Sequence, residues 1–364
     1  MTRSAGAIGR RDRVRARLAA DGLNALVVTS PANIRYLTGF SGSQGTVIIG
    51  DDPSRDRLVT DGRYELRAQR ETSDLAVVIS TDVAGVAVET VEATASANVG
   101  LESEHLTWAD ARRWQERLSD AKVASLATSG IVEAARTIKD ATEIAAIAAA
   151  CAMTTEAMKW AFDHLRSGQT EHEICVALER RFIDLGADGI AFPSIVACGI
   201  NGAVPHHRPT HRQVEQGELV TVDCGAIVDG YHADCTRTVA VGNPSSRMSE
   251  MHALVVEAQQ AGVDATVAGL VTGDVDAAAR SIIDDAGYSS AFVHGTGHGV
   301  GLEIHEAPSV TRGSTATLEV GTVITVEPGI YLADVGGVRI EDTLVVTDQG
   351  PQTLTDLERQ LVVV

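Results

Sequence analysis

Five residues in the C-terminal half of the chain have side chains that could bind metal ions. They are Asp223, Asp234, His298, Glu327 and Glu341, in the segments VDCG, HADCTRT, HGTGHGVG, ITVEPG and VRIEDT. Four carboxylates and one imidazole are hard ligands that suit two divalent ions sharing a hydroxide. Acidic side chains are rarely buried in apolar strands unless they are paired or bind metal. Because four of the five lie in or beside apolar, strand-like runs, we expect them to share cations.

Asp223 and Asp234 lie in a segment, residues 218–241, whose pattern predicts a β-hairpin. The Asp-Gly pair at 229–230 is its strongest turn signal. If that pair forms the loop, Asp223 faces residue 236, and the two aspartates become diagonal neighbours on one face. Two carboxylates this close repel unless they share a proton or a cation. A surface hairpin with ordinary acids is the alternative, but the flanking residues are apolar.

Three histidines, at positions 294, 298 and 305, lie in the glycine-rich segment HGTGHGVGLEIHE. A His-xxx-His pair is typical of the helical zinc motif of metalloproteases. Here the glutamate after the first histidine is absent, and the glycines disfavour a helix. We therefore expect a glycine-rich loop that leads into a strand, with one or two of the histidines acting at a site.

Glu327 ends the run TVITVE directly before Pro328, at the kind of strand end where catalytic side chains point into clefts. Arg339 lies two residues before Glu341, which places both side chains on one face of a strand. An arginine beside a metal-bound carboxylate can orient it, although a plain Arg–Glu strand pair is the alternative. Asp342 falls on the other face and is assigned a structural or solvent-exposed role.

The loop NGAVPHHRPT places His206 and His207 directly after a proline. One of the two can reach the site, and the other would be solvent-exposed or would cover it. These residues alone leave the choice between them open.

Two groups of elements must position these residues. In the first third, strands at 25–29, 46–49, 57–60 and 76–79 alternate with helical patterns at 10–20, 63–70 and 107–118. This alternation indicates an α/β domain with a mixed sheet. The boundary falls near 128–138, and we place the domains at residues 1–130 and 131–364.

The second domain begins with two capping-box signatures, Asp140 with Glu143 and Thr170 with Glu173. Helices are expected at 140–168, 170–186, 247–267 and 274–286, and strands at 190–198, 218–228, 232–241, 322–327 and 337–346. This order predicts an α+β domain, with helices on one side of a curved, largely antiparallel sheet.

Composition supports a globular, soluble protein with more than one core. The chain has 364 residues, 44% hydrophobic residues and a mean hydropathy of +0.05. Its net charge of −19 argues against nucleic acid and against an anionic membrane surface as partners. No apolar run reaches the roughly 18 residues of a transmembrane helix. The five cysteines are odd in number and lack CxxC spacing, which indicates reduced thiols in a cytoplasmic protein.

The N-terminal segment is basic, and no apolar stretch follows it, so no signal peptide is expected. Its arginines are interpreted as the solvated face of a first helix that ends near Gly22; they are Arg3, Arg10, Arg11, Arg13, Arg15 and Arg17.

The segments VDCGA, YHADCTRT, HGTGHGVGLEIHE, VEPGIY and GVRIEDT resemble the dinuclear pita-bread metallopeptidases. That family contains methionine aminopeptidase, aminopeptidase P and prolidase. NIRYLTGFSGSQG (33–45) and TDGRY (60–64) look like the N-terminal domain of the aminopeptidase P and prolidase branch, which methionine aminopeptidases lack. The resemblance covers nearly the whole chain. It implies a creatinase/prolidase-like α/β domain followed by a catalytic pita-bread domain.

The resemblance also implies a set of metal ligands. Asp223 resembles the carboxylate that binds one metal ion alone. Asp234 and Glu341 match the carboxylates that bridge both ions. His298 and Glu327 match the ligands of the other ion.

Further positions match residues that act beside the metals in this family. His206 resembles a loop histidine that contacts substrate, and it is preferred to His207 because the family places the functional histidine directly after this turn. His305 looks like the histidine that stabilises the tetrahedral intermediate. His294 and Arg339 match accessory positions that bind substrate or support the ligands.

The implied activity is hydrolysis of the peptide bond before proline, as in a Xaa-Pro dipeptidase or a Xaa-Pro aminopeptidase. A hydroxide bridging two metals would attack the carbonyl, and one metal with His305 would stabilise the oxyanion. Glu327 would pass the proton of the water to the proline nitrogen. Carboxylate-rich ligation favours Mn²⁺, with Fe²⁺, Co²⁺ or Zn²⁺ as alternatives. The expected partners are Xaa-Pro dipeptides or short peptides with proline second, and a second copy of the chain in a homodimer.

Two other functions occur on the same fold. One is a metal-free, creatinase-like C–N hydrolase, and the other is a non-catalytic peptide-binding pita-bread protein. Relatives of both kinds have lost metal ligands, whereas all five ligands are present here. A different dinuclear hydrolase, such as a phosphoesterase, fits the ligands alone, but the histidine loop and the N-terminal motifs argue against it. Dipeptidase and aminopeptidase both remain open.

Overall fold

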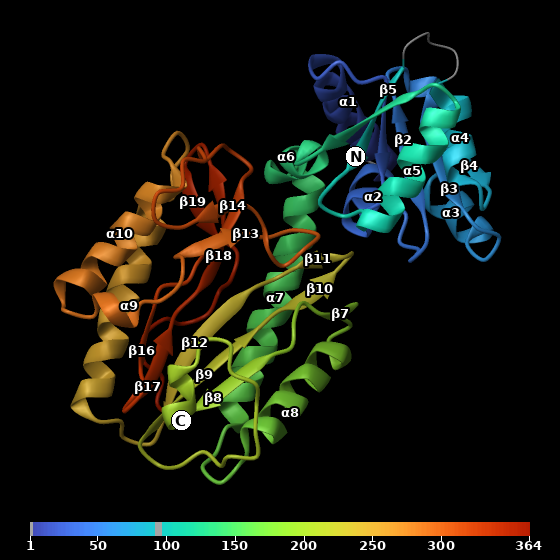
Figure 1. Ribbon diagram of the computed structural model, residues 1–364. Helices are drawn as coiled ribbons and strands as arrows, with labels where there is room; N and C mark the ends of the chain where they lie inside the picture. The colour runs from blue at the N-terminus through green and yellow to red at the C-terminus, as the bar shows by residue number, and fades with distance from the viewer. Residues whose placement is uncertain (1–2, 92–96) are drawn as a thin grey trace. The chain divides into compact units, whose positions relative to one another are not determined.

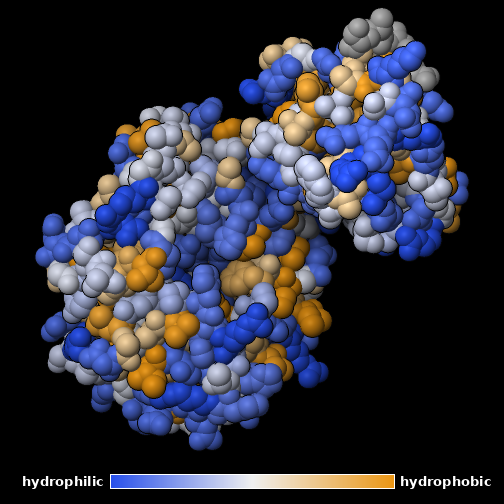
Figure 2. Space-filling model, viewed as in Figure 1, coloured by the Kyte–Doolittle hydropathy of each residue, from blue (hydrophilic) through white to orange (hydrophobic). Residues whose placement is uncertain are grey.

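The computed structural model describes residues 3–91 and 97–364, and the chain divides into two compact units (Figure 1). They are called here the N-terminal unit, Met1–Arg136, and the C-terminal unit, Thr137–Val364. Among the described residues, no helix is both long and apolar enough to cross a membrane. The face of the molecule in Figure 2 is largely hydrophilic, with apolar side chains in scattered patches.

The N-terminal unit contains a six-stranded sheet in the order β4-β3-β2-β1-β5-β6. Its central strand β1 pairs antiparallel with β2 and parallel with β5, which confirms the predicted mixed sheet. The strands are β1 Ala25–Val28, β2 Thr46–Gly50, β3 Arg57–Thr60, β4 Ala76–Ile79, β5 Asn98–Glu102 and β6 Ala124–Thr128. The helices are α1 Arg3–Ala20, α2 Pro31–Thr38, the 3₁₀ turn η1 Pro53–Arg55, α3 Glu65–Glu71, α4 Val83–Val91, α5 Trp108–Asp120 and α6 Ile131–Thr137.

The predicted solvated arginine face of α1 is wrong for Arg11, which is buried, and Arg10 and Arg15 are half-buried. The guanidinium of Arg11 is buried and donates to the carbonyl of Leu37 at 2.8 Å and to the carboxylate of Asp74 at 2.6 Å. Arg15 pairs with Asp56 at 2.9 Å. The acidic partners come from distant parts of the chain, so the local basic pattern could not reveal these ion pairs.

The C-terminal unit carries four α-helices among the described residues, α7 Ala141–His164, α8 Glu171–Asp184, α9 Ser246–Asp264 and α10 Thr272–Asp285. Both predicted capping boxes are present at the N-termini of α7 and α8, because each N-cap side chain and its partner glutamate bond reciprocally to the backbone. Helices α7 and α8 pack against apolar side chains of the hairpin strands, and α9 and α10 pack in a second cluster.

The strands of the C-terminal unit pair antiparallel in several small sheets. One sheet has the order β12-β9-β8 and a second has the order β14-β13-β15-β18-β19. The strands are β7 Gly189–Ile190, β8 Ile195–Cys198, β9 Glu218–Cys224, β10 Ala226–Val228, β11 Tyr231–His232, β12 Cys235–Val241, β13 Gly297–Gly299, β14 Glu306–Val310, β15 Val323–Val326, β16 Gly329–Leu332, β17 Gly336–Arg339, β18 Asp342–Thr347 and β19 Gly350–Thr353. The 3₁₀ turns η2 Gly199–Ala203 and η3 Ser289–Ala291 complete the unit.

Four segments predicted as single strands are each divided into two strands, namely 190–198, 218–228, 232–241 and 337–346. In the first and the last of these segments the chain changes its pairing partner. Strand β7 pairs with β10 while β8 pairs with β9, and β17 pairs with β16 while β18 pairs with β15. The break in segment 337–346 leaves Ile340 and Glu341 outside the ladders of β17 and β18. Contacts other than ladder hydrogen bonds therefore hold the backbone at Glu341.

Cys224 and Cys235 pack in the core of the C-terminal unit. Both thiols are fully buried, in the cluster formed by α7, α8 and the hairpin. All five cysteines are free and buried, and no disulfide joins them.

Candidate metal centre

Asp223 and Asp234 are positioned by the hairpin that the sequence predicts. Asp223 lies in β9 and pairs with Thr236 of β12, and Asp234 directly precedes β12. The turn residues Asp229 and Gly230 both have positive φ, 50° and 77°, as a two-residue type I′ loop requires. The predicted register is therefore confirmed, and the two aspartates are diagonal neighbours on one face.

Glu341 and Glu327 enter the same region from interrupted strands. The backbone N–H of Glu341 donates to the carbonyl of Thr236 at 3.0 Å, and the Thr236 hydroxyl donates to Glu341 Oε2 at 2.8 Å. Glu327 directly follows β15, and its N–H donates to the carbonyl of Thr296 at 2.7 Å. The predicted position of Glu327 at a strand end is confirmed.

His298 lies in the middle of the short strand β13, not in a preceding loop, and a bulge follows it. Its Nε2 atom is 3.5 Å from Asp234 Oδ2 and 3.5 Å from Glu327 Oε1. Its Nδ1 atom is 3.0 Å from the carbonyl oxygen of Gly299. A hydrogen bond at Nδ1 leaves the Nε2 lone pair for a cation, as in most histidine metal ligands.

The glycines beside His298 allow the backbone to pack closely around the site. A Cβ atom on Gly297 would collide with the carbonyl oxygen of Thr325, and one on Gly299 would collide with that of Ala307. This close approach explains why Gly297 and Gly299 flank His298 in a strand although glycine weakens strands.

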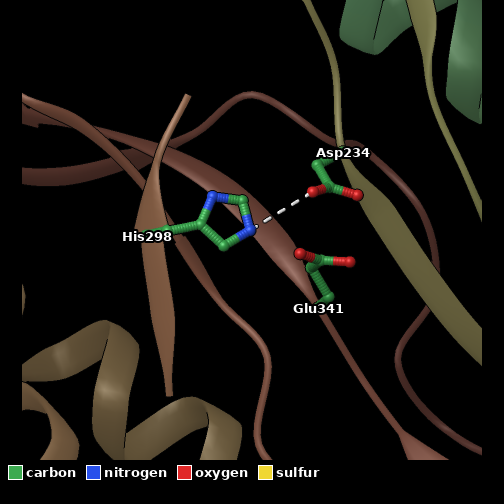
Figure 3. Close-up of side chains that lie close together, drawn as sticks. All are labelled: Asp234, His298 and Glu341. Carbon is green, nitrogen blue, oxygen red and sulfur yellow. Dashed lines mark ion pairs between the residues drawn. The ribbon is translucent and has the colours of Figure 1, made fainter. Parts of the chain in front are cut away.

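Figure 3 shows the side chains of Asp234, His298 and Glu341 converging from three segments of the C-terminal unit. Each offers a ligand atom, and these atoms all lie within 4.8 Å of one another. Asp223 and Glu327 flank this group and contribute their negative charge to it.

The pKa values of the carboxyl groups indicate that these groups need a nearby positive charge to be ionised together. Burial raises the pKa of Asp234 and Glu341 well above the usual range, and the neighbouring carboxylates raise both further. Burial likewise raises the pKa of Glu327 to about 8, although Arg339 opposes the shift. Burial lowers the pKa of His298 to about 4, which keeps the imidazole neutral and able to coordinate.

Two buried oxygens, Asp223 Oδ1 and Glu341 Oε1, have no hydrogen-bond partner among the described residues. A buried carboxylate oxygen without a donor is costly. Divalent cations would satisfy both oxygens, and oxygen-rich ligands with one imidazole suit such ions. The donor set therefore fits a dinuclear metal centre.

Arg339 connects Asp223 to the surrounding side chains. Its Nη2 donates to Asp223 Oδ2 at 2.6 Å, its Nε donates to the Thr236 hydroxyl at 3.1 Å, and its Nη1 donates to the Tyr331 hydroxyl at 2.8 Å. That hydroxyl is also 2.8 Å from His294 Nε2. The sequence reasoning missed Tyr331, although it lies in the quoted segment VEPGIY, because a tyrosine in a strand is usually a packing residue.

The remaining histidines differ in their surroundings. The rings of His305 and His298 meet edge to face, with centroids 4.4 Å apart. The proximity of His206 contributes to lowering the pKa of both His294 and His305, after the larger effect of burial. His207 instead places its Nε2 2.9 Å from the buried carboxylate of Glu171.

Comparison with known proteins identifies both units. Residues 145–348 match the model of Metallopeptidase family M24, and residues 10–138 match that of the Creatinase/Prolidase N-terminal domain. A Xaa-Pro dipeptidase of Pyrococcus furiosus is 34% identical over 339 residues, which are 93% of this chain and 95% of the relative.

Solved structures agree over the whole chain. A Xaa-Pro dipeptidase from Bacillus anthracis superimposes with a TM-score of 0.94 at 35% identity, covering 98% of this chain and 100% of the other. An X-Pro aminopeptidase from Thermotoga maritima MSB8 gives a TM-score of 0.88 at 34% identity, with 97% and 99% covered. The predicted fold class, an α/β domain before an antiparallel α+β pita-bread domain, is confirmed.

Proposed function

Because the chain belongs to metallopeptidase family M24 and carries the Creatinase/Prolidase N-terminal domain, we propose that it hydrolyses the peptide bond before proline. The substrates are Xaa-Pro dipeptides or short peptides with proline second, as the names of its dipeptidase and aminopeptidase relatives suggest. The observation that carries this proposal is the cluster of three buried carboxylates with the half-buried Glu327 and His298, in which two oxygens lack a donor among the described side chains.

The proposed metal ligands are Asp223, Asp234, His298, Glu327 and Glu341, with Asp234 and Glu341 as the bridging pair. Mn²⁺ is the proposed ion, since most of the donors are carboxylate oxygens. When bound, two divalent ions would lower the pKa of water at the site and polarise the substrate carbonyl.

Each remaining site residue has a role that its contacts support. Glu327 is proposed to accept a proton and to return it to the proline nitrogen, which leaves as a secondary amine and needs that proton. His305, beside His298, would donate to the substrate oxyanion. Arg339 and His294 hold Asp223 and Tyr331 in place. His206 is proposed to contact substrate, and the contact of His207 with Glu171 supports this choice.

A homodimer in the cytoplasm is proposed as the working form. Five free, buried thiols suit a reducing compartment. The mass at micromolar concentration, measured by light scattering, tests the dimer, and a monomeric mass would argue against it.

The activity is tested with a chain-length series of Xaa-Pro peptides assayed with Mn²⁺, with Xaa-Ala peptides and a chelated sample as controls. Release of proline from dipeptides alone would identify a dipeptidase, and release of Xaa from longer peptides would identify an aminopeptidase. Absence of cleavage across the series in a metal-loaded sample would refute the proposal.

A further inference from the structure

Arg237 is among the largest fully buried side chains of the described chain, although it is charged, and the proposed reaction does not use it. It lies in β12, three residues after Asp234. Because strand side chains alternate, Arg237 and Cys235 point away from the face on which Thr236 contacts Glu341. Arg237 therefore lies behind the metal ligands.

All five N–H groups of this guanidinium have an acceptor, which is the full capacity of an arginine. Nη1 donates to the carbonyl oxygens of Thr236, at 2.9 Å, and of Glu341. Nη2 donates to Asp342 Oδ1 and to the carbonyl of Leu357, both at 2.7 Å. Nε donates to the carbonyl of Glu358 at 2.8 Å. Three of the acceptors belong to the residues beside or at the ligand positions, and two belong to the C-terminal segment.

Asp342, the ion-pair partner, directly follows Glu341 and is completely buried. Its Oδ1 also accepts from the Thr355 hydroxyl at 2.6 Å. Its Oδ2 accepts from Gln259 Nε2 at 2.9 Å and from Arg359 Nε at 2.6 Å. The carboxylate is thus held by four donors, and it anchors the start of β18.

The two strands that this pair joins belong to different sheets. Strand β12 lies in the sheet β12-β9-β8, and β18 lies in the sheet β14-β13-β15-β18-β19. No ladder among the described strands therefore sets the spacing between Asp234, before β12, and Glu341, before β18. The hydrogen bond from the Glu341 N–H to the Thr236 carbonyl and the contacts of Arg237 join the two strands at this point.

We propose that the Arg237–Asp342 pair is a positioning device for the two bridging carboxylates. It holds the backbone of Glu341 against the strand of Asp234 from the side opposite the metal ions. The carboxylates, which repel one another, then keep the spacing at which they can share cations. This inference rests on the proposed metal ligation.

The direction in which removal of Arg237 changes the metal affinity distinguishes a positioning role from a purely electrostatic one. Arg237 is a positive charge near several carboxylates, so its removal would strengthen cation binding if charge alone mattered. If Arg237 positions the ligands, its removal must weaken cation binding. Groups that orient metal ligands typically change metal affinity by about 10–100-fold.

The test compares metal-free wild type with Arg237→Met and Arg359→Met. Arg359 contacts the same aspartate but touches neither the Thr236 nor the Glu341 carbonyl, so it is a matched control for loss of one positive charge. Each protein is titrated with Mn²⁺ by calorimetry, and free Mn²⁺ is counted by electron paramagnetic resonance. We expect R237M to bind Mn²⁺ about 10–100-fold more weakly and R359M to stay within about threefold of wild type.

Equal or tighter Mn²⁺ binding by R237M would overturn the inference, even if that variant melts at a lower temperature. If R237M does not fold, Arg237→Lys keeps the charge but offers three donors in place of five, and weaker binding by it supports the inference while wild-type affinity refutes it. A wild-type protein that binds no Mn²⁺ and cleaves no Xaa-Pro peptide would instead refute the proposed function together with the inference.

Discussion

Glu171 and Glu341 are two buried glutamates of the C-terminal unit whose carboxylates have opposite environments. The oxygens of Glu171 accept from the N–H of Cys198 and the side-chain amide of Asn201, and they contact Thr210 and His207 at 2.7–2.9 Å. Burial raises the pKa of Glu171, but these hydrogen bonds outweigh burial and lower it to about 2.

Glu341 is equally buried, yet among the described residues it has one hydrogen bond to its carboxylate, from Thr236. Its second oxygen has no donor, and its pKa is raised by burial and by the neighbouring Glu327 and Asp223. Protein donors thus satisfy Glu171, which holds a loop in place. Glu341 lacks such donors, which is the condition expected of a carboxylate that binds a cation.

Glu341→Gln should have the largest effect on activity. We expect Xaa-Pro hydrolysis to fall about 1,000-fold, because loss of a proposed bridging ligand removes several kcal/mol of transition-state stabilisation. The metal-free variant should melt at or above the temperature of the metal-free wild type, since an uncompensated buried charge is lost. Initial rates and thermal melting of both proteins test this. A variant with wild-type rates would show that Glu341 is not a ligand.

Glu171→Gln should have the opposite profile. The unfolding free energy should fall by about 2–4 kcal/mol, because a buried network loses its charged acceptor and its donors are left unsatisfied. Mn²⁺ stoichiometry should stay that of the wild type. Urea denaturation measures the loss, and Glu156→Gln, which removes an exposed partner of Arg181, is the control with a change below about 1 kcal/mol. Equal stability of E171Q and wild type would refute the assigned role.

The difference in unfolding free energy between wild type and E171Q should depend on pH. The folded-state pKa of Glu171, about 2, lies below its ordinary value of 4.5, so its stabilisation is complete above pH 4.5 and is lost as pH falls toward 2. In metal-free samples, the gap in unfolding free energy between wild type and E171Q should therefore shrink steadily over this window. A gap that stays constant from pH 6 to pH 2.5 would show that the charge of Glu171 is not what stabilises the loop.

The adjacent histidines give the smallest expected effects. His206→Asn should lower kcat/KM by about 10–100-fold, the value of a hydrogen bond to a charged or reacting group, without changing the melting temperature. His207→Asn should lower the unfolding free energy by about 1–2 kcal/mol through its lost contact with Glu171. Steady-state kinetics and thermal melting of both variants test these expectations. If His207→Asn lost activity and His206→Asn lost stability, the substrate contact would be assigned to His207 in place of His206.

Much of the candidate site could be predicted because the sequence features that indicate it act over a few neighbouring residues. The Asp-Gly turn at 229–230 and the two-residue period of a strand determine the register of Asp223 against Thr236. The Pro328 that follows β15 places Glu327 at a strand end. The family motifs point to the same residues, and the raised pKa values around Asp234 and Glu341 support them.

Other features depend on residues that are far apart in the chain. Arg237 is bonded to carbonyls more than 100 residues away, at Glu341, Leu357 and Glu358. Arg11 likewise contacts Leu37 and Asp74, which are 26 and 63 residues away, so the local pattern could not show these contacts. Asp342 contacts Gln259 and Arg237, which are 83 and 105 residues away, so its pattern could indicate only a structural or solvent-exposed role.

The amino-acid pattern was thus sufficient for the types of the proposed ligands, the strand-end position of Glu327 and the pairing of the hairpin, because turns and side-chain alternation act over a few neighbouring residues. The three-dimensional structure was needed to show which buried carboxylates accept hydrogen bonds from protein donors and which have oxygens without a donor that could bind a cation. That distinction depends on hydrogen-bond partners from distant segments, as Glu171 and Glu341 show. Packing of separate sheets against one another selects those partners, and no local rule encodes that packing.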